Sequence, residues 1–208
     1  MSARADDVLI LGVGNILWAD EGFGVRCAEA FHAAYADEPG LRVMDGGTQG
    51  LNLLGDVQGA RRLILFDALD FGRPAGELLV LRDAEVPRAL NAKMMSLHQA
   101  SVMELLACAG LLGAAPEAIT VIGFQPVLLD DYGGCLTPQA AAAVPAAVAL
   151  GARELQRWGY EMRPRGPGDR PEPLLDASLA FSAYAAGRPS ATEACRVGDA
   201  RFLDGLVA

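Results

Sequence analysis

Several features that define large classes of proteins are missing from this chain of 208 residues. Lys93 is its only lysine, and the formal net charge is −9 at pH 7. Nucleic-acid and anionic-membrane surfaces require clustered basic side chains, so the charge balance predicts neither nucleic acid nor membrane as a partner. The chain lacks an apolar run of about 18 residues, the length of a transmembrane helix. Its acidic start, residues 1–7, is not a signal-peptide pattern, and we expect a cytoplasmic protein.

Cysteine and histidine are scarce. The four cysteines form no C-x-x-C pair, which argues against a zinc knuckle or a thiol redox motif and favours reduced thiols. A serine hydrolase is disfavoured because no G-x-S-x-G motif occurs. Cys135, in a glycine-rich loop, is the one candidate for Cys–His catalysis. The two histidines are His32 and His98.

Apolar runs alternate with segments of helical periodicity. The runs predict strands over residues 8–11, 41–44, 62–66, 77–81 and 119–124. The periodic segments predict helices over residues 24–36, 51–57, 99–112 and 138–158, the last disturbed at Pro145. This alternation predicts an α/β fold with a mostly parallel sheet that is covered on both faces. We expect one domain over residues 1–160. A Pro/Gly/Arg-rich linker and C-terminal tail follow over 161–208, with one small helix within 174–186.

Polar side chains follow four of the expected strands, and two more, Ser96 and His98, precede the helix expected from residue 99. In an open parallel sheet, ligands bind beyond the carboxyl ends of the strands, so these residues should meet at one edge. They are Asn15, Asp20, Glu21, Asp45, Thr48, Asp67, Asp70, Ser96, His98, Gln125, Asp130 and Asp131.

A nucleotide site is one interpretation of this edge. Gly12-Val-Gly14 after the first strand has the form of a dinucleotide fingerprint, but Leu17 stands where its third glycine should be. Asp20 and Glu21 would also repel a phosphate, which disfavours this interpretation.

A metal site is the other interpretation. Glu21, Asp67 and His98 offer two carboxylates and one imidazole, a mixed set that suits nickel or zinc and leaves coordination positions open. Ordinary structural roles stay open for the same residues, because acids favour helix N-termini and aspartate favours turns.

Several motifs in consistent order resemble the nickel–iron hydrogenase maturation endopeptidases, over roughly residues 7–160. Three motifs are most similar to those of the family members that serve membrane-bound uptake hydrogenases. They lie at residues 18–21, 96–99 and 129–134. The segments that carry the family resemblance are 8–26, 45–54, 66–68, 95–99 and 123–126.

The resemblance implies a three-layer sandwich with a twisted, mostly parallel five-stranded sheet between helices. It implies an endopeptidase that removes a C-terminal extension from the hydrogenase large-subunit precursor after nickel insertion. Nickel, carried by the substrate, would be read through Glu21, Asp67 and His98, and zinc or cadmium could occupy the same site. Asp45 is implicated in activity, and Asp20 belongs to the same motif as Glu21.

The resemblance leaves the chemistry of cleavage open. A metal could activate the peptide bond or a water, or a carboxylate such as Asp45 or Asp20 could be the general base. A nickel-dependent hydrogenase assembly chaperone without proteolysis is the alternative function. The tail over 161–208, whose residues 188–203 resemble an extension of the uptake group, is a candidate docking segment for the precursor or accessory proteins. A disordered end is the other interpretation of the tail.

Overall fold

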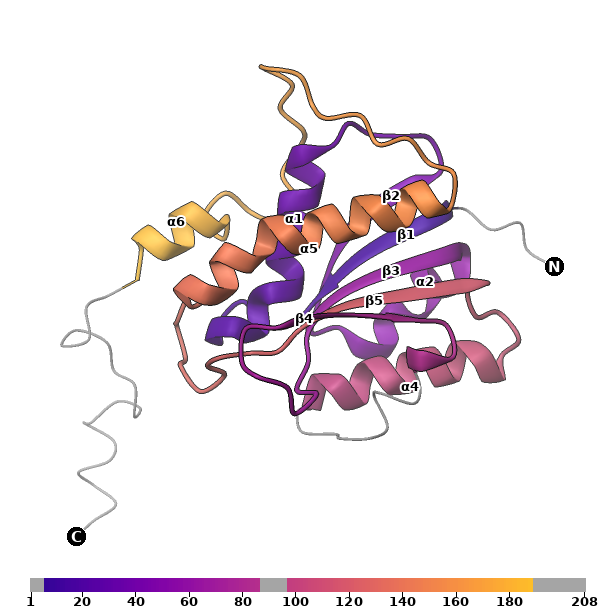
Figure 1. The fold of residues 1–208 in the computed structure, drawn as a ribbon, viewed down its shortest axis with the longest axis horizontal. Coiled ribbons are helices and arrows are strands. Elements are labelled where there is room, and N and C mark those ends of the chain that lie inside the picture. The colour runs from indigo at the N-terminus through magenta and orange to yellow at the C-terminus, as the bar shows by residue number, and fades with distance from the viewer. Residues whose placement is uncertain (1–5, 87–96, 189–208) are drawn as a thin grey trace, which may run out of the picture.

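The centre of the molecule is a twisted five-stranded sheet in the order β2-β1-β3-β5-β4 (Figure 1). The computed structural model describes residues 6–86 and 97–188. Strand β1 pairs in parallel with β2 and β3, β3 pairs in parallel with β5, and β4 runs antiparallel to β5 at the edge. The strands are β1 (Asp6–Val13), β2 (Leu41–Gly47), β3 (Ala60–Ala68), β4 (Leu78–Arg82) and β5 (Ala118–Phe124).

Helices cover both faces of this sheet (Figure 1). Alternate residues of β1 show the two layers, because Val8 and Ile10 pack with α1 and α5 whereas Leu9 and Leu11 pack with α2 and α4. All four of these side chains are fully buried. The expected α/β three-layer sandwich is confirmed. The covering helices are α1 (Phe23–Ala34), α2 (Leu54–Gly59), α4 (Leu97–Leu111) and α5 (Pro138–Arg157).

Two glycines allow α1 to lie directly against the sheet. A Cβ atom at Gly24 would sit 2.2 Å from the carbonyl oxygen of Phe66 and 2.3 Å from that of Val13. A Cβ atom at Gly12 would sit 2.3 Å from the carbonyl oxygen of Gly24. The first turn of α1 therefore contacts the ends of β1 and β3. This contact places the preceding 3-10 turn η1 (Ala19–Gly22) at the carboxyl edge of the sheet.

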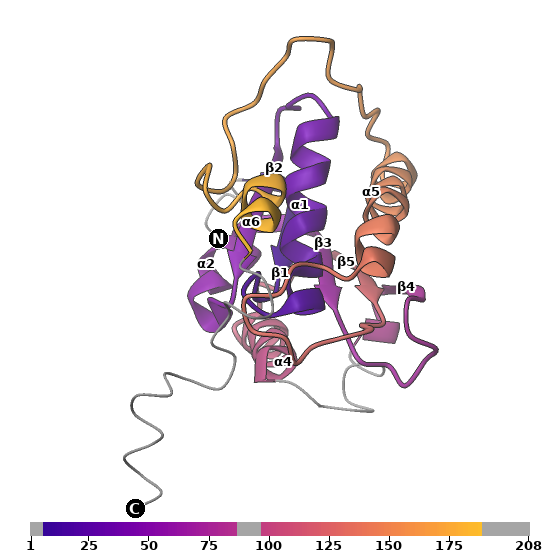
Figure 2. The same ribbon diagram turned by 90° about the vertical axis from the view of Figure 1, so that its left-hand side faces the viewer.

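The segment after α5 folds back along α1 (Figure 2). Ala36 N donates to Arg163 O at 2.9 Å, and Arg165 N donates to Ala34 O at 2.9 Å. A short helix, α6 (Phe181–Ala186), then lies beside α1. Residues 161–188 are thus joined to the body of the molecule by hydrogen bonds.

Helix boundaries differ from the sequence-based expectations in two places. Helix α5 continues through Pro145, so the expected disturbance does not end it. The last helix is limited to Phe181–Ala186, because residues 174–180 form turns and bends that the apolar pattern did not distinguish from helix. Within residues 6–86 and 97–188, every helix is too short or too polar to span a lipid bilayer.

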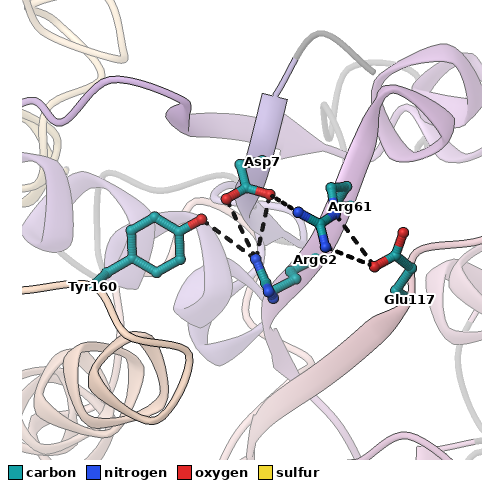
Figure 3. A network of polar contacts seen from close by, with 5 residues as sticks. All are labelled: Asp7, Arg61, Arg62, Glu117 and Tyr160. Atoms are coloured by element: carbon teal, nitrogen blue, oxygen red, sulfur yellow. Dashed lines mark hydrogen bonds and ion pairs between the residues drawn. The ribbon is translucent and has the colours of Figure 1, made fainter. Parts of the chain in front are cut away.

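Charged side chains form a network at the amino edge of the sheet (Figure 3). Asp7 Oδ1 accepts hydrogen bonds from Arg61 at 3.2 Å and Arg62 at 3.3 Å. Arg61 also pairs with Glu117 at 3.1 Å, and Arg62 donates to the Tyr160 hydroxyl at 3.4 Å. Ion pairs this exposed contribute little to stability. The opposite edge, where the parallel strands end, holds the candidate site.

Replacement of Gly24 by alanine should destabilise the protein, because the new methyl group would overlap two backbone carbonyl oxygens that cannot move independently. We expect Gly24→Ala to lower the free energy of unfolding by ~1–3 kcal/mol or more. Gly55→Ala in α2 is the matched control, since its Cβ meets nothing within 4 Å. That control should gain ~0.5–1 kcal/mol. Urea unfolding measures both, and equal stability of the two variants would contradict the close packing.

Candidate functional site

Asp67 and Glu21 are brought together at the carboxyl edge of the sheet. Asp67 lies near the end of β3, paired in register with Gly123 of β5, and its side chain is 0% exposed. Burial raises the pKa of Asp67 well above its ordinary value. The charge of Glu21 raises this pKa further, whereas the backbone N–H of Ala68 opposes the shift. The effect of Glu21 on Asp67 shows that two carboxyl groups 46 positions of sequence apart share one environment.

His98 lies in the first turn of α4. This helix packs against η2 (Gly50–Leu53), which follows β2, and its other end leads into the start of β5. The backbone of His98 is therefore at the same edge of the sheet as Glu21 and Asp67. Its side chain lies outside the described residues, so its assignment as a third ligand stays a prediction. The side chains that the structure does describe form no cluster of three metal-ligating groups.

Asp20 ties η1 to the segment between β5 and α5. Its side chain is 0% exposed. Its Oδ2 accepts hydrogen bonds from Val127 N at 2.9 Å and Leu128 N at 3.1 Å. Thr137 donates from its backbone N to Oδ1 at 2.7 Å and from its hydroxyl to Oδ2 at 3.1 Å. The geometry thus gives Asp20 a positioning role beside Glu21. The catalytic role assigned to it from the sequence stays a prediction.

Asp45 occupies a separate, half-buried position in β2. Its Oδ1 accepts a hydrogen bond from Gly47 N at 2.8 Å. Burial is the largest cause of a raised pKa at Asp45, and the Glu29 charge adds to it. The Gly47 bond and the Arg26 charge act in the opposite direction. A carboxyl group with a raised pKa suits a general base, because it holds a proton more readily than an ordinary aspartate does.

The strand order separates Asp45 from Asp67. Strand β1 lies between β2 and β3, and neighbouring strands are about 4.8 Å apart, so the two backbone positions are separated by about 10 Å across the sheet. The edge therefore offers two carboxylate sites, one built on Glu21 and Asp67 and the other on Asp45.

Arg26 and Glu29 are site residues that sequence reasoning missed. Both lie on α1, and Arg26 Nη1 donates to Glu29 Oε2 at 2.9 Å. Arg26 is only 4% exposed, and both charges act on the pKa of Asp45. Their spacing of three residues places them on one face of α1, which is the signal that could have identified them.

The turn after β1 does not have the form of a phosphate site. Gly14 has φ of +127°, and a Cβ atom there would sit 1.9 Å from the carbonyl oxygen of Glu21. The backbone of η1 therefore covers the glycine that would have to approach a pyrophosphate. The geometry gives no support to the nucleotide interpretation.

Comparisons with known proteins agree on one family. A sequence profile described as hydrogenase maturation protease matches residues 25–154. The hydrogenase expression/formation protein HupD of Rhodobacter capsulatus is 49% identical over 200 residues, which cover 96% of this chain and 94% of that protein. HoxM of Cupriavidus necator is 48% identical, covering 94% and 98%. The solved hydrogenase maturating endopeptidase HybD from Escherichia coli has a TM-score of 0.71 and 36% identity, covering 76% and 97%.

These likenesses extend beyond isolated motifs. The profile match includes β2, β3, β4 and β5, and the HupD and HoxM matches extend over most of the chain. They support proteolysis over the chaperone alternative. The chain belongs to the hydrogenase maturation protease family, and it is an endopeptidase, a hydrolase that acts on peptide bonds.

Proposed function

We propose that this endopeptidase removes a C-terminal extension from the large-subunit precursor of a nickel–iron hydrogenase after nickel has been inserted. We further propose that Glu21, Asp67 and His98 read the nickel that the precursor carries. The observation that supports this is the meeting of Glu21 with the fully buried Asp67 at the carboxyl edge of the sheet.

The donor set fits a borderline divalent cation. Two carboxylates and an imidazole suit nickel, and they also suit zinc or cadmium as substitutes. Three protein donors leave positions that ligands of the precursor can complete. Glu21, Asp67 and His98 would then bind the loaded precursor more tightly than the empty one, because the metal bridges the two proteins. This difference in affinity makes nickel a condition for processing.

Asp45 is proposed as the general base of cleavage. Its second carboxylate oxygen can accept a proton from the water that attacks the scissile carbonyl and pass it to the amine that leaves when the peptide C–N bond breaks, while Gly47 N holds the other oxygen. Asp20 is a second carboxylate candidate by sequence, but its four hydrogen bonds suit it to positioning Glu21. On this proposal the protein has an aspartic-type mechanism in which nickel serves recognition.

The cytoplasm is the proposed compartment. Three cysteines are described, Cys27, Cys108 and Cys135, and all three are free thiols. Burial raises the pKa of Cys27 well above its ordinary value, which keeps that thiol protonated and unreactive. Reduced thiols of this kind are typical of a cytoplasmic protein.

Removal of a proposed nickel ligand should abolish processing and leave the fold intact. We expect Glu21→Gln and His98→Ala each to slow cleavage of nickel-loaded precursor by more than about 100-fold. The assay is a gel-mobility shift with mass measurement of the trimmed C-terminus, run beside nickel-free precursor. Glu161→Gln, on an exposed residue, is the matched control and should process normally. Normal trimming by either ligand variant would show that the replaced residue is not a nickel ligand. Binding of the precursor by the unchanged protein without trimming would favour the chaperone.

The pH dependence of cleavage should report Asp45. The base acts only when deprotonated, so the rate should rise with pH through a pKa that lies above the ordinary 3.8. Glu29→Gln removes the nearby negative charge that raises this pKa, so the acid limb should move to lower pH. Asp45→Asn should lower the rate by about 10²–10⁴-fold on the plateau above this pKa and should abolish the acid limb. If the acid limb of the Glu29→Gln variant lies at the same pH as that of the unchanged protein, the increase of the cleavage rate with pH belongs to a group other than Asp45.

A further inference from the structure

Exposed apolar side chains gather beside the carboxylates of the site. Leu17 follows β1 and is 38% exposed, while Val127, Leu128 and Tyr132 follow β5 and are 40–58% exposed. We call these four residues the apolar rim. Three further leucines are exposed in the described residues: Leu51 lies in η2, which follows β2, and Leu111 and Leu112 lie at the end of α4 away from this edge. Exposed apolar residues that cluster at one place mark an interaction surface more often than scattered ones do.

Backbone hydrogen bonds fix the two halves of the apolar rim against each other. Gly133 N donates to Leu17 O at 2.7 Å, and Asp20 N donates to Leu128 O at 3.1 Å. The rings of Trp18 and Tyr132 are 5.3 Å apart. Glu21 N donates to Trp18 O at 2.9 Å, so the rim continues directly into the proposed nickel-reading residue.

The charges around the apolar rim restrict what it can bind. Glu21 and Asp130 are acidic neighbours in the same segments, and the whole chain carries a formal charge of −9. A second copy of this chain would bring these acids face to face, and an acidic partner would be repelled. The occupant must therefore be apolar and either neutral or positively charged.

We propose that the apolar rim binds the part of the hydrogenase precursor that adjoins the scissile bond, an extended apolar segment without acidic side chains. This inference rests on the proposed function. The rim supplies contact area beside Glu21, so the metal and the peptide are bound as one ligand and the bond is presented in a fixed orientation.

Polar substitution of the rim should weaken precursor binding without slowing the chemical step. We expect Leu128→Ser and Tyr132→Ser each to raise KM for nickel-loaded precursor about tenfold, with kcat within twofold of the unchanged protein. Leu111→Ser and Leu112→Ser are matched controls that make the same change at the far end of α4. They should leave both constants unaltered.

The outcomes separate this inference from the proposed function. If the unchanged protein does not trim the precursor, the proposed function fails. If it trims the precursor while the rim variants keep its KM, the docking surface alone is wrong. Loss of a dimer in Leu128→Ser, seen by sedimentation, would assign the rim to a second copy and also overturn the proposal.

A separate observation concerns the C-terminal segment 161–188. Arg26, on α1, donates to Leu179 O at 2.7 Å, and its guanidinium lies 5.4 Å from the ring centre of Phe181. At the end of the segment, Arg188 pairs with the buried Asp131 at 2.7 Å. One segment is thus anchored both to the charged pair that acts on Asp45 and to the loop that carries Tyr132.

We infer that residues 161–188 brace the site, with Arg188 as a positioning residue that holds the loop after β5. Arg188→Ala and Asp131→Asn should each raise KM for the precursor at least threefold at an unchanged melting temperature. The double variant should be no worse than either single one, because both remove the same contact. Arg188→Lys should restore binding in part, and Arg170→Ala, on an exposed residue of the same segment, should change nothing. Additive effects, or an unchanged KM in Arg188→Ala, would overturn the brace.

Discussion

The close contact between α1 and the sheet determines where the chemistry of this protein lies. Because Gly24 has no side chain, the first turn of α1 rests on the carbonyl groups of Phe66 and Val13. The 3-10 turn that precedes α1 is then confined to the carboxyl edge, directly beside the end of β3. Glu21 reaches Asp67 for this reason. A bulkier residue at position 24 would lift the helix and with it one of the two carboxylates, so a packing constraint in the core is also a constraint on the site.

Burial of Asp67 destabilises the charged form of its carboxyl group. A cation bound at the site would remove this destabilisation. A carboxyl group without solvent contact next to a second acid is unfavourable in its charged form, which is why its pKa is raised. A cation delivered by another protein would relieve the repulsion between Glu21 and Asp67. The protease would then gain affinity only for a substrate that brings that charge.

Much of the fold could be predicted from the sequence. A strand that is buried on both faces consists of consecutive apolar residues, as over 63–66 in β3. The rule that parallel strands end at one edge then predicted that Glu21 and Asp67 would meet. The 3-10 turn could not be predicted, because Ala19 adopts φ of +39° to suit its surroundings rather than its own preference. The roles of Asp20 and Arg188 also depend on partners more than 50 positions away, and short-range patterns do not contain such contacts.

On the proposed function, the site separates recognition of the precursor from cleavage by the width of one strand. Glu21 and Asp67 lie on one side of β1 and Asp45 on the other, about 10 Å apart in strand position. An extended peptide spans that distance in about three residues. The two side chains point to opposite faces of the sheet, because Gly12 pairs with both Asp45 and Phe66, the neighbour of Asp67. A precursor held by its metal at the first pair would therefore have to pass over the carboxyl edge to reach Asp45. On the proposed function, nickel held at Glu21 and Asp67 would select the loaded precursor, and the fixed spacing of the strands would also set which peptide bond reaches Asp45.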